Sequence, residues 1–124
     1  MKMYRKGIAC EVEECYTKER RVNELWRKLF KDAWPASIPL SDTLYLFCDE
    51  DGLLKNLPLN FLIRKENLPL QPIVGDAIMV HLDKSKDDPQ EFVVGDVTEA
   101  DREVLKHLFN EEQQREWLIQ YFTN

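Results

Sequence analysis

The chain has 124 residues, 44% of them hydrophobic and 32% charged, which supplies enough apolar surface for one core and excludes both overall disorder and a second domain. No apolar run approaches the ~18 residues of a membrane span, and no signal-like stretch follows residues 1–7, so we expect a single cytoplasmic domain over residues 1–124. The net charge of −6 is uneven, because residues 1–31 carry nine Lys or Arg and five Glu, a net of +4, whereas residues 32–124 carry eight and eighteen, a net of −10.

The first third of the chain predicts a strand and then a helix. Apolar residues among charged neighbours indicate a strand over Met3–Val12. Apolar residues then recur at three-and-four spacing over Val22–Ala33, which predicts a helix that begins near Thr17. Pro35 ends this helix, because proline disfavours helical geometry in the residue before it.

The outer face of this helix is basic. Its cationic side chains include Arg20, Arg27 and Lys31. Such a face is typical of a helix that contacts nucleic-acid phosphates, or of a helix that lies across its own acidic domain as an ordinary solvated surface. We favour the second interpretation because mixed surface charge is the norm. Nucleic acid therefore stays a disfavoured alternative partner.

The middle of the chain predicts a central strand between breaks. We expect Pro35–Pro39 to be a linker and Leu44–Cys48, an apolar run bounded by turn residues, to be a strand. Asp49–Gly52 indicates a turn, after which residues 53–54 are expected to begin a returning strand. Several prolines interrupt the chain after this turn, so Leu59–Arg64 can form at most a short helix or strand.

The next segment predicts a second hairpin. β-branched residues indicate a strand over Ala77–Leu82, and Gly75 before it suggests a bulge or a close backbone approach. A polar loop over Asp83–Gln90 leads to another strand over Glu91–Val94.

Two consecutive helices complete the predicted fold. Thr98 and Asp101 have the spacing of a helix N-cap pair, and Asn110 with Gln113 repeats it where the apolar face changes direction after Phe109. The element order predicts an α+β fold: a small, mostly antiparallel sheet packed by an N-terminal-half helix and two consecutive C-terminal helices.

No catalytic, cofactor or metal motif is recognisable. The histidines His81 and His107 lie outside any known signature, and the cysteines Cys10, Cys15 and Cys48 lack the spacing of a metal site. We expect the cysteines to be reduced and mostly buried, with a Cys48–His81 pair on neighbouring strands as an alternative. The isolated glycines form no phosphate-binding loop. We therefore predict no metal, no cofactor and no catalytic residue.

Acidic residues offer an alternative site. Asp49, Asp51, Asn60 and Asp76 would form a small active site or ligand site if their side chains converged in one cleft. Turns and helix starts explain such residues equally well through backbone hydrogen bonds and the helix dipole. We favour that structural explanation.

The end of the last predicted helix is unusually apolar. It carries Trp117, Leu118, Ile119, Tyr121 and Phe122, more than a helix needs to cover one side. These residues either pack on the first helix or form a contact with a protein partner or a second copy, because Trp and Tyr are common at interface centres.

The segments LYLFCDEDGLLKNLPLNFLI and PIVGDAIMV resemble a family of small domains that occurs in bacteriophages and in conjugative or integrative elements. The matching positions are Cys48, Glu50, Gly52, Leu57, Pro58, Asn60, Gly75 and Ile78. Departures from the family pattern are Asp49 for Asn, Asn56 for Gly and Phe61 for Arg. The resemblance covers Leu40–Phe109 and implies no activity. It implies an accessory protein of a mobile element, with host or defence modulation among the roles, which we expect to act by binding a macromolecule.

Overall fold

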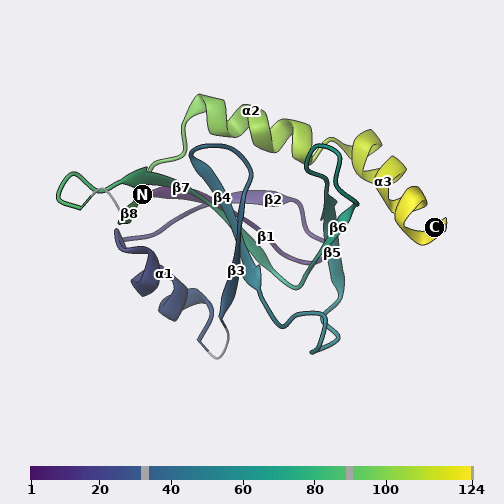
Figure 1. Cartoon of the computed structure of the whole chain (residues 1–124), viewed down its shortest axis with the longest axis horizontal. Helices are drawn as coiled ribbons and strands as arrows, with labels where there is room; N and C mark the ends of the chain where they lie inside the picture. The colour runs from purple at the N-terminus through teal and green to yellow at the C-terminus, as the bar shows by residue number, and fades with distance from the viewer. Residues whose placement is uncertain (32–33, 89–90, 124) are drawn as a thin grey trace.

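An antiparallel sheet of six strands forms the centre of the computed structural model, which describes residues 1–31, 34–88 and 91–123. The strand order is β2–β1–β7–β4–β3, and β8 pairs with β7 beyond the end of β1 (Figure 1). The strands are β1 (Lys2–Lys6), β2 (Val12–Tyr16), β3 (Pro35–Pro39), β4 (Leu44–Asp49), β7 (Ala77–Lys84) and β8 (Phe92–Gly95). A separate pair consists of β5 (Leu59–Ile63) and β6 (Gln71–Val74).

Helices cover both faces of the sheet, because β4 and β7 alternate apolar side chains toward each side. α2 (Glu99–Leu108) and the β5–β6 pair cover the face that includes Leu46 and Met79. α1 (Val22–Leu29) covers the opposite face, which includes Phe47 and Val80. α3 (Glu111–Thr123) follows α2 and extends away from the sheet beside β5 (Figure 1). The predicted α+β class, with one helix in the first half and two consecutive helices later, is confirmed.

The predicted single strand over Met3–Val12 is wrong, because the chain turns within it. Cys10 N–H donates to the Gly7 carbonyl at 3.2 Å, and Ala9 has φ of 58°. β1 and β2 on either side of this turn form a hairpin. Gly7 at the start of this turn is a typical turn residue, but Ala9 and Cys10 are not, so the strand-like pattern concealed the turn.

α1 is shorter than predicted. It begins at Val22, not near Thr17, because the preceding residues make sheet contacts: Thr17 N–H donates to the Met1 carbonyl at 2.9 Å and Val94 N–H to the Arg20 carbonyl at 2.7 Å. The helix ends at Leu29, and the last predicted helical residues, 32–33, lie outside the described residues.

Pro35–Pro39 is an edge strand rather than the predicted linker. It pairs with β4 from Pro35 opposite Asp49 to Pro39 opposite Tyr45. An edge strand tolerates proline because one row of its backbone groups has no neighbouring strand. The predicted returning strand at residues 53–54 is also wrong, since these residues belong to a turn, and the next strand along the chain is β5.

The later elements agree with the sequence pattern. β7 and β8 form the predicted hairpin, although β7 continues to Lys84, and residues 89–90 of the predicted loop lie outside the described residues. Gly75 has φ of +73° and leads from β6 into β7, so its backbone conformation favours glycine. Thr98 and Asp101 form a capping box at α2, and Gln113 N–H donates to Asn110 Oδ1 at 2.9 Å at the start of α3.

Candidate functional site

Side-chain hydrogen bonds hold α3 against β5. Gln114 accepts a hydrogen bond from the Leu62 N–H at 3.1 Å and donates to the carbonyls of Leu62 at 2.9 Å and Leu108 at 2.8 Å. Gln114 thus takes the place of a neighbouring strand on the edge of β5. Further along α3, Arg64 Nη2 donates to Gln120 Oε1 at 3.2 Å. The start of α3 is therefore fixed without a buried apolar face.

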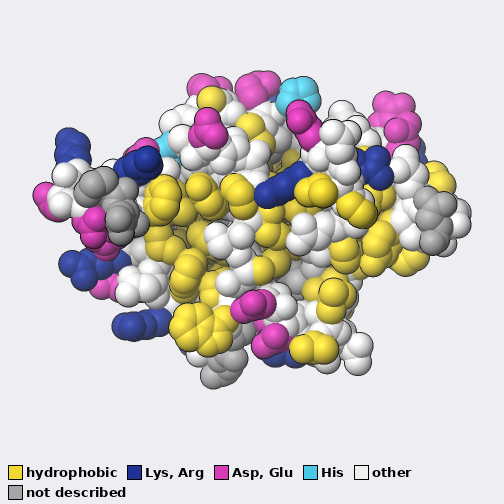
Figure 2. Space-filling model, in the orientation of Figure 1, with side chains coloured by type: hydrophobic (Ala, Val, Ile, Leu, Met, Phe, Trp, Pro, Cys, Tyr) yellow, Lys and Arg dark blue, Asp and Glu magenta, His cyan; other side chains and the backbone are white. Residues whose placement is uncertain are grey.

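Residues 117–122, which we call the α3 end, are apolar at every position except Gln120. Trp117 packs against the core cluster that includes α2, but none of the described residues of α3 is buried. The remaining apolar residues are exposed, from 37% for Leu118 to 71% for Phe122; they are Leu118, Ile119, Tyr121 and Phe122. Figure 2 shows hydrophobic side chains gathered over this helix at the right of the molecule. Large apolar side chains on a helix are normally buried, whereas these four are exposed to solvent.

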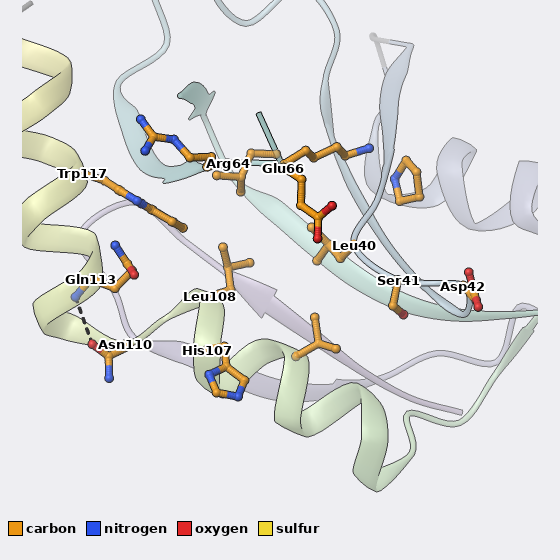
Figure 3. A pocket seen from close by; sticks show the side chains of 14 residues that line it. Leu40, Ser41, Asp42, Arg64, Glu66, His107, Leu108, Asn110, Gln113 and Trp117 are labelled. Carbon is orange, nitrogen blue, oxygen red and sulfur yellow. Dashed lines mark hydrogen bonds between the residues drawn. The ribbon is translucent and has the colours of Figure 1, made fainter. Parts of the chain in front are cut away.

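A groove of about 830 Å³ lies beside the α3 end (Figure 3). We call it the α2–α3 groove. Its apolar lining consists of Pro39, Leu40, Ile63, Val104, Leu108 and Trp117. Its rim is polar and includes Arg64, Lys65, Glu66, His107 and Asp42. Trp117 and Arg64 lie at one end of the groove, and Ser41 and Asp42 lie at the other. An apolar floor with a polar rim is the usual anatomy of a docking surface.

The position of α3 tests the prediction that the α3 end packs on the first helix. α3 lies beside β5, and Figure 1 shows it at the other end of the molecule from α1. The alternative in which Trp117 and its neighbours pack on the first helix is therefore wrong. The physical reason is that α3 follows α2, which covers the face of the sheet opposite to α1. The partner interpretation stays a prediction.

The basic residues of the predicted first helix are exposed but do not form one cluster, and Arg20 and Lys31 lie outside α1. Arg27 and Lys31 line a hollow of about 520 Å³ with Trp26, Phe30 and Trp34, which we call the α1 hollow. Trp34 is 74% exposed. Arg20 does not line this hollow.

The residues of the alternative acidic site do not form a site in the structure. Asp49 accepts hydrogen bonds from Lys55 Nζ at 2.7 Å and from the Asp51 N–H at 2.8 Å, contacts that close the turn after β4. Asn60 Nδ2 donates to the carbonyls of Lys6 and Gly75, both at 2.8 Å, and so ties β5 to two other segments. Asp51 and Asp76 are exposed. None of these contacts brings the carboxylates together.

His81 is buried in a polar network beneath α2. The two-residue period of β7 places it on the α2 face with Met79. Its Nδ1 lies 2.6 Å from Asp101 Oδ2, and its Nε2 lies 2.9 Å from Asp83 Oδ1. Ionised carboxylates only accept, so both ring nitrogens can donate at once when the imidazole is protonated. Burial alone lowers the pKa of His81, but the two carboxylates outweigh it and raise the pKa above its usual value.

Asp101 completes this network. Burial alone raises its pKa, but hydrogen bonds from the Thr98 N–H at 2.9 Å, Thr43 Oγ1 at 2.8 Å and His81 outweigh burial and lower the pKa. With both nitrogens of His81 engaged, neither is available as a base. Cys48 pairs with Ala77, four residues from His81 along β7, so the alternative Cys48–His81 pair does not form.

The cysteines differ from the prediction. Cys48 is buried, and burial raises the pKa of its thiol to about 11, but Cys15 is half-buried and Cys10 is exposed. Cys10 and Cys15 belong to the turn and edge strand of the unpredicted β1–β2 hairpin, which explains their exposure. Among the described residues, no group of three or more His, Cys, Asp or Glu side chains has the arrangement of a metal site.

Comparison of the chain with family models, with curated proteins and with solved structures finds no match. In the described ranges, no helix combines the length and the apolar character needed to cross a membrane.

Sequence reasoning identified the α3 end but missed the groove beside it. Leu40, Arg64 and His107 come from three separate segments, and nothing in their local spacing connects them. The contact of Gln114 with β5 was also missed. Its side-chain amide can both donate to and accept from the backbone groups at the edge of a strand. Only the tertiary arrangement of α2, α3 and β5 brings these residues together.

Proposed function

We propose that this chain is a non-enzymatic accessory protein of a phage or other mobile element, and that it acts by binding another protein molecule through α3. The observation that carries the proposal is the apolar α3 end, which is exposed although it carries five large apolar residues in six positions. Covering such a surface with a partner removes it from water, at about 25 cal/mol per Å² of apolar area. The resemblance of residues 40–109 to a phage-associated family supplies the biological context.

Two further features support binding rather than catalysis. The most buried ionisable side chains, His81 and Asp101, bind each other and hold α2 to the sheet. The acidic residues that the sequence offered as an alternative active site make turn contacts instead. The α2–α3 groove adds apolar surface next to the α3 end, and Trp117 belongs to both.

The test is affinity capture from a lysate of the cells in which the chain is naturally made, with the wild type, Phe122→Glu and Leu54→Glu as baits. Leu54 is 86% exposed and lies in the turn after β4, so its variant is a matched control for the loss of an exposed apolar side chain. We expect the Phe122 variant to lose the captured protein and the Leu54 variant to keep it. Equal capture by all three baits contradicts a role for α3.

The α1 hollow favours a second candidate, binding of single-stranded nucleic acid. Trp34 and Phe30 supply flat aromatic surfaces, and Arg27 and Lys31 supply cations beside them, which is the combination that such proteins use for bases and phosphates. The test is fluorescence anisotropy with a labelled single-stranded DNA at low and high salt. Binding that falls with salt and is lost in Trp34→Ala supports this candidate, and no binding at low salt ends it.

A further inference from the structure

We propose that the partner of the α3 end is a second copy of this chain, and that the α3 end of each copy lies in the α2–α3 groove of the other. This inference rests on the proposed function, because it names the protein that α3 binds. The first observation is that the α3 end, which would insert, and the α2–α3 groove, which would receive it, lie on the same edge of the molecule. Trp117 belongs to both, since one face of its ring lines the groove and its helix continues into residues 118–122.

Proximity of helix and groove is what a twofold contact requires. In an isologous dimer the same patch is used by both copies, so a helix and the groove that receives it must be neighbours. A twofold axis between them buries both helix ends and both grooves in one closed interface. A helix and groove on opposite sides of the molecule would instead give a head-to-tail contact, which forms a ring or an open chain of copies. In this structure the α3 end and the groove are neighbours, as a closed twofold dimer requires.

Shape and size are compatible with this exchange. The groove is a depression of about 830 Å³ with an apolar floor, and the α3 end offers side chains that are branched or aromatic. The 14 residues that line the groove, with the four exposed apolar residues of the α3 end, approach the ~20 residues that each partner contributes to a stable interface.

Charge does not oppose this pairing. The groove rim carries two cations, Arg64 and Lys65, and two carboxylates, Asp42 and Glu66, whereas residues 117–122 carry no charge. Insertion of the α3 end into the partner's groove therefore buries no unpaired charge of this segment.

The exposed edges of the main sheet are poorer sites for self-association. The outer strand β3 begins and ends with proline, and the outer strand β2 carries Glu13 and Glu14. Proline and charged residues on edge strands are devices that prevent edge-to-edge pairing. α3 thus offers the better self-complementary surface.

Sedimentation velocity over a wide range of protein concentration tests the inference. We expect a reversible species of twice the 14.7 kDa mass of the chain. Phe122→Glu in α3 and Val104→Lys in the groove are each expected to raise the dimer Kd roughly thirtyfold or more, as at an interface hot spot. Leu54→Glu is expected to leave the Kd unchanged. Thermal unfolding of each variant separates loss of the dimer from loss of the fold.

A mixture of isotope-labelled and unlabelled copies identifies the contact itself. We expect intermolecular NOEs between the Phe122 ring and the methyl groups of Val104 and Leu108. A dimer without these NOEs, or a chain that stays monomeric at every concentration, overturns the inference. A monomer whose capture of another protein is sensitive to Phe122→Glu rejects the second copy but retains the proposed function. A monomer whose capture is insensitive rejects both.

Discussion

Removal of the Asp101 carboxylate is expected to destabilise the fold more than loss of any single surface charge. Asp101→Ala deletes the acceptor for His81 Nδ1, for Thr43 Oγ1 and for the Thr98 N–H, and so also breaks the capping box of α2. The Asp101 side chain is 1% exposed and that of His81 is 8% exposed, so neither water nor salt replaces the lost contacts.

The expected loss in the free energy of unfolding follows from the burial of Asp101 and His81. Removing one partner of a buried ion pair costs about 3–5 kcal/mol, and here the His81 ring would keep only its contact with the exposed Asp83. For a domain of this size, a loss of that magnitude lowers the Tm by on the order of 10–15 °C. Asp101→Asn keeps an amide oxygen that can accept from Thr98 and Thr43, so we expect a smaller loss, about 1–3 kcal/mol.

The pair also predicts how stability depends on pH. The pKa of His81 is raised in the folded state, so its contribution is fully present below its ordinary pKa of 6.5 and is lost as the pH rises through the folded-state pKa. The pKa of Asp101 is lowered, so its contribution is present above its ordinary pKa of 3.8 and is lost as the pH falls through the folded-state value. The stabilisation is therefore greatest between these two ordinary pKa values.

Urea unfolding at a series of pH values measures both effects. The wild type should lose free energy of unfolding as the pH rises above 6.5, and Asp101→Ala should lack most of this decline. Asp87→Ala, which removes an exposed carboxylate from the loop after β7, is the control for net charge. If Asp101→Ala lies within about 1 kcal/mol of the wild type, or if the wild-type profile is flat above pH 6.5, the ion-pair interpretation is refuted.

Three further outcomes are expected. In Gly95→Ala, the new Cβ would lie 2.7 Å from Asp83 Oδ2 and 3.0 Å from His81 Cδ2, so we expect the displaced Asp83 to weaken the decline of stability above pH 6.5 in the same urea series. In Gly75→Ala, the positive φ costs about 1–2 kcal/mol, whereas Gly7→Ala, whose Cβ meets no atom closer than 3.6 Å, should change the urea midpoint little. In Gln114→Ala, the Leu62 N–H loses its acceptor, and we expect faster amide hydrogen exchange at Leu62 with at most a small change in global stability.

The sequence pattern determined the elements whose signals are local. Leu44–Cys48 and Ala77–Leu82 were predicted as strands because β-branched and aromatic residues gather there between turn residues. The caps at Thr98 and Asn110 were predicted because each cap is a contact between residues three positions apart. The α3 end was also apparent, because apolar residues on every side of a helix are a property of composition alone.

Other features depended on contacts between distant segments. Pro35–Pro39 is a strand only because β4 supplies a partner, and Met3–Val12 contains a turn that a single glycine, Gly7, marks in the sequence. Nothing in the sequence pattern indicates that His81, which lies in a strand, meets Asp101 in a helix twenty residues later. That meeting depends on the strand period and the path of α2 across the sheet.

The sequence by itself therefore determined that this chain has an α+β fold with an apolar helix end, because helix and strand periodicity, capping and composition act over a few residues. Only the tertiary structure decided that α3 lies beside β5 and away from α1, that a groove opens next to it, and that the buried histidine is held by two carboxylates. The physical reason is that each of these depends on which faces of the sheet the helices cover, and burial of distant apolar residues against one another sets that choice.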